Sequence, residues 1–90
     1  MATVRIPTQL RTLSGGAAEV SVDGSTVGEV LKALESAHPG FHARLFDDGG
    51  GLRRFVNVFV ADEDVRFTDG LDTAVADGQT VSIIPAVAGG

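Results

Sequence analysis

A single stretch of this 90-residue chain has the pattern of a long amphipathic helix, and it restricts the folds that the rest can form. Its apolar residues follow the i, i+3, i+4, i+7 spacing that places them on one helix face: Val27, Val30, Leu31 and Leu34. Thr26 and Glu29 match a capping box at the start, and His38-Pro39-Gly40 ends the pattern. We therefore expect one helix over residues 27–37 with one buried stripe.

Segments on both sides of this helix alternate between apolar and polar residues, which is the period of a half-buried strand. We expect strands at residues 3–7, 19–22, 55–60, 65–67 and 80–84. Glycines within residues 14–17 favour a hairpin between the first two strands, and Asp62-Glu63-Asp64 forms a turn before the fourth. Residues 41–46 and 71–75 each predict a short helical turn, and residues 47–51 predict a mobile loop.

This order of elements predicts an α+β fold of the β-grasp, or ubiquitin-like, class. A hairpin, a crossing helix and then further strands place the first and last strands parallel at the sheet centre. We expect a mixed sheet of four to five strands with one main helix packed on one face. The length allows one domain, over residues 1–84, followed by a flexible tail over residues 85–90.

The composition excludes several classes of function. The net charge is −5, and one lysine with six arginines gives no basic stripe, so nucleic-acid binding is disfavoured and an acidic surface suits a partner with a basic rim. The absence of cysteine removes disulfides, thiolate metal sites and thiol nucleophiles. No apolar run is long enough for a membrane span or a signal peptide, so we expect no membrane contact and a cytoplasmic location.

Side chains offer no convincing catalytic or metal-binding set. His38 and His42 are four residues apart, but Pro39-Gly40 breaks the helix that would align them on one metal. Asp47-Asp48 lacks the ligand spacing of a calcium loop, and the carboxylates of residues 62–64 are typical of a solvated turn. We expect no metal site and no catalysis by a side chain of this chain.

The C-terminal segment Pro85-Ala86-Val87-Ala88-Gly89-Gly90 directly follows the last predicted strand. Pro85 removes a backbone donor and is expected to end that strand. At roughly 3.3 Å per residue, six residues carry the carboxylate of Gly90 about 20 Å from the fold, far enough to enter another protein's active site. Gly89 and Gly90 have no Cβ, so they fit a narrow channel and leave the terminal carbonyl open to attack. An ordinary frayed terminus remains the alternative.

The free α-carboxylate of Gly90 is an anion at neutral pH and a poor electrophile, so it must be activated. Adenylation by ATP on a separate enzyme would give an acyl phosphate anhydride. Sulfide or a persulfide could then displace AMP and leave a thiocarboxylate. This chemistry is supplied in trans, and the small domain acts as the handle that positions the tail.

Four segments carry a resemblance to a known family: residues 54–60 (Arg-Phe-Val-Asn-Val-Phe-Val), residues 62–67 (Asp-Glu-Asp-Val-Arg-Phe), Gly70-Leu71 and residues 85–90. With them, the chain resembles the ThiS/MoaD sulfur carriers over essentially its whole length, and most closely the CysO branch. The resemblance implies adenylation of Gly90 by an E1-like (ThiF/MoeB-type) enzyme. That enzyme uses ATP and Mg²⁺, while the carrier itself binds no cofactor and is a co-substrate rather than an enzyme.

The same resemblance implies further partners. A sulfur-acceptor synthase would receive the sulfur for cysteine or for another sulfur-containing metabolite, such as a cofactor or natural product. In the CysO branch, a JAMM-type metallopeptidase would then release the product. Two other functions stay open: a ubiquitin-like modifier joined through Gly90 to lysines of target proteins, and a plain binding module whose tail is incidental.

The fold also predicts a face for docking partners. On the strand of residues 55–60, the valines at 56, 58 and 60 are assigned to the core. Phe59 would then be exposed on the open sheet face together with Ile84, and the tail residues Pro85, Ala86, Val87 and Ala88 would extend the contact. The alternative is that Phe55 and Phe59 pack under the loop of residues 47–51.

Overall fold

Helix α1 spans Val27–Ala37, which are the boundaries that the sequence predicts. Thr26 is the N-cap, and its Oγ1 accepts a hydrogen bond of 3.2 Å from the backbone N–H of Glu29. The Glu29 carboxylate accepts hydrogen bonds of 3.0 Å from both the backbone N–H and the hydroxyl of Ser25. The cap thus fixes the first turn of α1, because it satisfies donors that have no partner within the helix.

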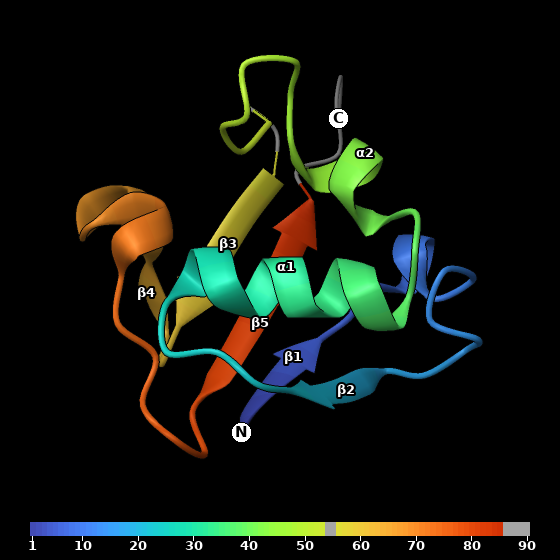
Figure 1. The fold of residues 1–90 in the computed structure, drawn as a ribbon, viewed down its shortest axis with the longest axis horizontal. Coiled ribbons are helices and arrows are strands. Elements are labelled where there is room, and N and C mark those ends of the chain that lie inside the picture. Colours follow the sequence, from blue (N-terminus) through green and yellow to red (C-terminus); the bar gives the residue numbers. More distant parts are fainter. Residues whose placement is uncertain (54–55, 86–90) are drawn as a thin grey trace.

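The computed structural model describes residues 1–53 and 56–85, which form a mixed sheet with α1 across one face (Figure 1). The strands are β1 (Ala2–Arg5), β2 (Glu19–Val22), β3 (Val56–Val60), β4 (Glu63–Asp64) and β5 (Thr80–Pro85), in the spatial order β2-β1-β5-β3-β4. β1 and β5 are parallel neighbours at the centre, and the other neighbouring strands are antiparallel. The predicted β-grasp arrangement is confirmed.

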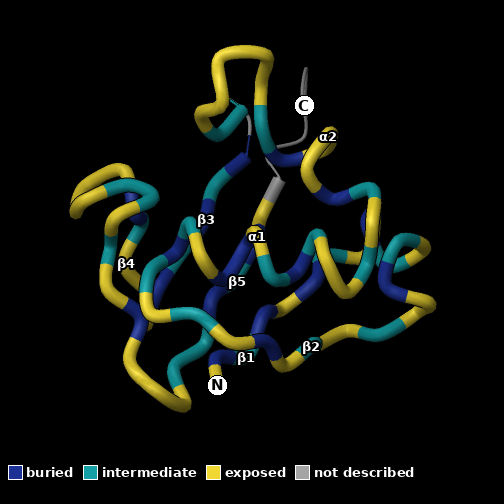
Figure 2. Tube along the Cα trace, viewed as in Figure 1, coloured by how far each residue is buried: buried dark blue, intermediate teal, exposed yellow. Residues whose placement is uncertain are grey.

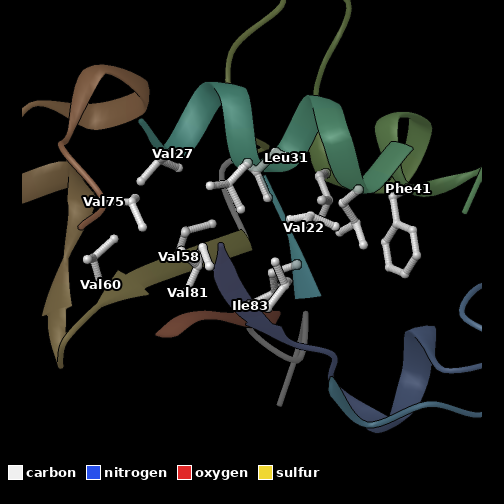
Figure 3. Close-up of a cluster of buried hydrophobic side chains, with 14 of the residues drawn as sticks. Val22, Val27, Leu31, Phe41, Val58, Val60, Val75, Val81 and Ile83 are labelled. Carbon is white, nitrogen blue, oxygen red and sulfur yellow. The ribbon is translucent and has the colours of Figure 1, made fainter. Parts of the chain in front are cut away.

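The hydrophobic core lies between α1 and the sheet (Figure 3). The predicted helix stripe, from Val27 to Leu34, is at most 1% exposed at each apolar position. Val56, Val58 and Val60 are all buried, as predicted, while the alternate residues of β3 are half-buried. Buried segments of β1, β3 and β5 lie beneath α1 (Figure 2), so burial of one apolar face on each layer stabilises the fold.

Helix α2 (Phe41–Leu45) occupies the place of the first predicted short helical turn. Glu35 on α1 fixes its start, since the carboxylate accepts hydrogen bonds from the backbone N–H groups of Gly40 (3.0 Å) and His42 (2.6 Å). Phe41 and Leu45 of α2 are fully buried. α2 therefore closes one end of the core.

The prediction for residues 65–67 is wrong. They form a 3-10 helix, η2 (Val65–Phe67), and the strand β4 that precedes it occupies part of the predicted turn. The chain reverses one residue earlier than expected, at Ala61 and Asp62, which adopt φ values of 50° and 71°. Asp64 then caps η2, because its Oδ1 accepts a hydrogen bond of 2.9 Å from the backbone N–H of Arg66. This side-chain cap competes with strand pairing.

Two further short elements differ from the sequence prediction. The turn expected at residues 71–75 is a 3-10 helix, η3 (Gly70–Asp72), which begins one residue earlier and is shorter. A 3-10 helix that the sequence did not indicate, η1 (Thr8–Leu10), lies between β1 and β2, and Leu10 from it joins the core. The connection between the first two strands is therefore longer than a tight hairpin turn.

Candidate functional site

The predicted reactive tail follows β5, the strand that lies between β1 and β3. β5 includes Pro85, which pairs with Val56 of β3, so the strand runs one residue further than predicted. A proline is tolerated there because the last residue of a strand need not donate to the ladder. The remaining predicted site residues lie outside the described residues: Ala86, Val87, Ala88, Gly89 and Gly90.

The open face of the sheet carries Ile84 beside the root of this tail. Ile84 is 49% exposed, as predicted, and it faces Asn57 across the pairing of β5 with β3. Phe59 is half-buried, and this corrects the prediction that it is exposed. It has a strand neighbour on each side, since it pairs with Ser82 of β5 and with Asp64 of β4. The packing of Phe55 lies outside the described residues.

A hollow of about 590 Å³ adjoins Ile84 at the ends of β1 and β5. Its lining includes two guanidinium groups, one carboxylate and several uncharged residues, among them Arg5, Arg11, Glu19, Pro7, Ser82 and Ile84. Arg5 Nε lies 3.9 Å from Glu19 Oε2. Arg11 Nε donates a hydrogen bond of 3.1 Å to the backbone oxygen of Ile6, which holds the side chain against the wall. The surface beside the tail root thus combines an apolar side chain with the guanidinium of Arg11 and the ion pair of Arg5 with Glu19.

Charged side chains are distributed unevenly along the axis of β5. Arginines lie toward the end where the tail leaves: Arg11 follows β1, and Arg53 precedes β3 and donates a hydrogen bond of 3.2 Å to the backbone oxygen of Ala43 in α2. One carboxylate, Glu19, lies at this end too and pairs with Arg5. The opposite end of the sheet carries carboxylates that follow β2 and β3 or precede β5: Asp23, Asp62, Glu63 and Asp77. The net charge suggests a partner with a basic rim. Such a rim would fit the end of the sheet away from the tail, where these four carboxylates lie.

The N-terminal amine of Met1 lies at the same end of the sheet as these carboxylates. Met1 N forms an ion pair with Asp77, and that hydrogen bond raises the pKa of the amine and lowers the pKa of the Asp77 carboxyl. Both charges are exposed to solvent, so the pair contributes little to stability.

Sequence reasoning missed one exposed aromatic side chain. Phe67 in η2 is 88% exposed, the largest exposed fraction among the large apolar residues of the described chain. The signal lay in its neighbours, because residues 62–72 contain five carboxylates around a single phenylalanine. Because its side chain is exposed to solvent, Phe67 does not contribute to the core.

His42 and Asp47, two possible metal ligands in the sequence, make contacts within the fold. The His42 ring stacks on Phe46 with 4.8 Å between ring centroids, and Asp47 Oδ1 accepts hydrogen bonds from the backbone N–H groups of Gly49 and Gly51. Within residues 1–53 and 56–85, no three potential metal ligands come together. The part of the chain that the structure describes also contains no helix of the length and hydropathy needed to cross a membrane.

The sheet order, the parallel central pair and the single covering helix define a small ubiquitin-like β-grasp protein, with its central strand leading into the C-terminal segment. The chain belongs to the ThiS family, whose sequence profile matches residues 4–90. This match, together with the CysO relatives described next, confirms the resemblance to ThiS/MoaD carriers of the CysO branch.

Individual relatives support this assignment. The sulfur carrier protein CysO of Mycobacterium tuberculosis is 54% identical over 90 residues, which cover 98% of this chain and 97% of that protein. A chain in the crystal structure of the Amycolatopsis orientalis BexX/CysO complex is 52% identical, with full coverage of both chains and a TM-score of 0.93. Small archaeal modifier protein 3 of Haloferax volcanii is 44% identical over 68 residues, which cover 76% of this chain and 73% of that protein.

Proposed function

We propose that this chain is a sulfur carrier protein whose reactive group is the α-carboxylate of Gly90. The observation that carries the proposal is the match to the ThiS family through Gly90, together with 54% identity to a protein named as a sulfur carrier. The fold supports it, because the central strand β5 leads directly into residues 86–90.

The proposed reaction begins at an oxygen of the Gly90 carboxylate. This oxygen attacks the α-phosphate of ATP, pyrophosphate leaves, and an acyl adenylate forms on an E1-like enzyme of the ThiF/MoeB type. Sulfide then attacks the carbonyl carbon, AMP leaves, and the thiocarboxylate forms directly. If the terminal sulfur of a persulfide attacks instead, AMP leaves and an acyl disulfide forms; a second thiol of the donor enzyme must then cleave its S–S bond, forming a disulfide on that enzyme and releasing the thiocarboxylate. The chain contributes an anchored and unhindered carbonyl, while ATP and Mg²⁺ belong to the activating enzyme.

The described residues serve to position the tail. Ile84 and the adjoining hollow with Arg5 and Arg11 form the surface that an activating enzyme would cover while the tail enters its active site. β5 pairs with β1 through Ser82 and with β3 through Pro85, so the root of the tail is held by pairing with β3 rather than by a loop. The structure of a CysO chain in complex with BexX supports docking onto partner enzymes in general.

The proposal extends to the use of the sulfur. We infer that a sulfur-acceptor synthase receives it for cysteine, or for another sulfur-containing metabolite, and that a JAMM-type metallopeptidase releases the product in the cysteine route. The chain acts as a co-substrate of these enzymes. Because adenylation consumes ATP, the proposal also assigns the carrier to the cytoplasm.

Intact-mass measurement tests the proposal. The purified chain is incubated with its activating enzyme, ATP, Mg²⁺ and sulfide, and we expect a mass increase equal to the difference between sulfur and oxygen. A chain that lacks Gly90 is the control and should gain no mass. If the full chain gains none with an enzyme that is active on another ThiS-family carrier, the proposal is wrong.

A second candidate function is protein modification, favoured by the 44% identity to small archaeal modifier protein 3. The same acyl adenylate would react with the amine of a target lysine, with loss of AMP, to give an isopeptide bond at Gly90. The test is a search for higher-mass conjugates that survive a strong thiol reductant. Conjugates that also form with the chain lacking Gly90 would contradict this function.

A further inference from the structure

Phe67 is the most exposed large apolar side chain in the described part of the protein, at 88%. It lies in η2, beyond the edge strand β4, on a largely exposed segment of the fold (Figure 2). Its neighbour Val65 is fully buried, so the core already takes its apolar side chain from this segment. The ring of Phe67 therefore takes no part in the core and is accessible to a partner.

The position of Phe67 is fixed by its neighbours. Arg66 Nη1 donates a hydrogen bond of 2.7 Å to Asn57 Oδ1, and Arg66 Nη2 donates one of 2.7 Å to the backbone oxygen of Arg53. Thr68 Oγ1 donates a hydrogen bond of 3.1 Å to the backbone oxygen of Val65. With bonds on both sides, η2 presents the ring from a defined backbone, which lowers the entropy cost of binding.

The surroundings of Phe67 carry negative charge. Residues 62–72 hold five carboxylates, at Asp62, Glu63, Asp64, Asp69 and Asp72, against the single guanidinium of Arg66. Asp64 accepts a hydrogen bond from the backbone N–H of Arg66, while the Arg66 guanidinium binds outside the segment, to Asn57 and to the backbone oxygen of Arg53. No ion pair within residues 1–53 and 56–85 involves any of the five carboxylates. The surface around the ring therefore attracts lysine and arginine side chains.

The segment is connected to the root of the tail. Asn57, which accepts the hydrogen bond from Arg66, is the cross-strand neighbour of Ile84. Ile84, Asn57 and the Arg66 guanidinium are therefore neighbours on the sheet, and Phe67 is the next residue of the chain after Arg66. A protein that covers Ile84 while it receives the tail would have to extend past Asn57 and the Arg66 guanidinium to reach Phe67.

We propose that Phe67 anchors this chain to its activating enzyme, which presents an apolar pocket bordered by lysine or arginine side chains. The choice of this partner rests on the proposed function. The five carboxylates of residues 62–72 steer the basic border of the pocket, and insertion of the ring removes its apolar surface from water.

The test measures the Kd between the purified activating enzyme and the carrier by calorimetry. Phe67→Ala should raise the Kd by about 10-fold or more, whereas Phe67→Leu should retain most of the affinity. The Glu63→Gln/Asp69→Asn variant should show a weaker dependence of Kd on salt than the unmodified chain. Lys32→Ala, on the outer side of α1, is the matched control and should leave Kd unchanged.

Thermal unfolding of each variant confirms that it is folded, and an 88% exposed ring can be removed without creating a cavity.

ATP–pyrophosphate exchange on the same samples separates the two proposals. Exchange with the unmodified chain, together with a Kd for Phe67→Ala within about twofold of it, would overturn the role of Phe67 and leave the carrier function intact. Binding without exchange would overturn the carrier function, while the Kd comparison still decides on Phe67. Absence of any binding would overturn both.

Discussion

Arg66 on η2 and Asn57 on β3 are joined by a hydrogen bond of 2.7 Å between Nη1 and Oδ1. The edge strand β4 has only two residues and pairs with Phe59 and Val60, so it leaves the first half of β3 without a strand partner on that side. The Arg66 side chain lies at this uncovered edge and also bonds the backbone oxygen of Arg53. A side chain thus takes the place of strand pairing there.

Loss of the Arg66 guanidinium should destabilise this edge. For Arg66→Ala we expect a decrease of about 1 kcal/mol in the free energy of unfolding, because two hydrogen bonds of a partly solvated group are removed. Arg66→Lys should give an intermediate decrease, since an ammonium group lacks the forked geometry that reaches both oxygens. Urea unfolding measures both. An equal decrease for Arg44→Ala, an exposed residue of α2, would show that the loss of charge alone is responsible.

Ile84 should affect docking and leave the fold unchanged. Because this side chain is 49% exposed, Ile84→Asp removes little core contact, and the midpoint of thermal unfolding should stay close to that of the unmodified chain. The KM for the carrier in ATP–pyrophosphate exchange should rise by about 10-fold or more, since a charge replaces an apolar contact at the interface. Unchanged KM would contradict the docking face.

Gly24 is required by the entry into α1. Its φ is +153°, and a Cβ there would lie 2.7 Å from the backbone nitrogen of Val30. Gly24→Ala should therefore lower the free energy of unfolding by about 1–3 kcal/mol, because backbone strain and overpacking both oppose it. Gly51→Ala is the matched control, since a Cβ at Gly51 meets no atom within 4 Å. Chemical denaturation that shows equal losses for both variants would disprove this account.

Glu29 gives the helix cap a defined dependence on pH. Hydrogen bonds from the backbone N–H and then from the hydroxyl of Ser25 lower the pKa of Glu29 below 4.5. A carboxyl with a lowered folded-state pKa stabilises the fold above its unfolded-state pKa, and this stabilisation is lost as pH falls through the folded-state value. Thermal unfolding should show Glu29→Gln less stable than the unmodified chain at pH 7, with the difference disappearing on acidification below pH 4.5. A difference that stays constant with pH would contradict the role of the charge.

The position of the terminal carboxylate should be decisive for activity. One alanine added after Gly90 leaves the fold unchanged and places a methyl group at the reactive carbonyl, so thiocarboxylate formation should fall below detection by intact-mass measurement. One glycine added at the same place is the control for tail length alone. Normal sulfur transfer by the alanine-extended chain, without trimming, would refute the role of Gly90.

Local patterns in the sequence determined the main elements. The boundaries of α1, its Thr26 cap and the inward valines of β3 follow from helix and strand periodicity and from neighbouring side chains, which are short-range effects. The β-grasp topology also follows from the order of the elements, because connectivity and handedness leave few alternatives. The role of Gly90 was inferred from the ending of the chain together with the order of the strands, and it stays a prediction because residues 86–90 lie outside the described residues.

Only the tertiary structure decided what happens at the edges of the sheet. Residues 65–67 have a strand-like pattern, but the Asp64 cap and the bonds of Arg66 to β3 turn them into η2 and leave Phe67 in solvent. The half-burial of Phe59 likewise depends on β4 lying beside it. The gathering of Asp23, Asp62, Glu63 and Asp77 at one end of the sheet arises when the strands pair. These features rest on contacts between residues that are brought together only by folding, and the pattern of one segment cannot report them.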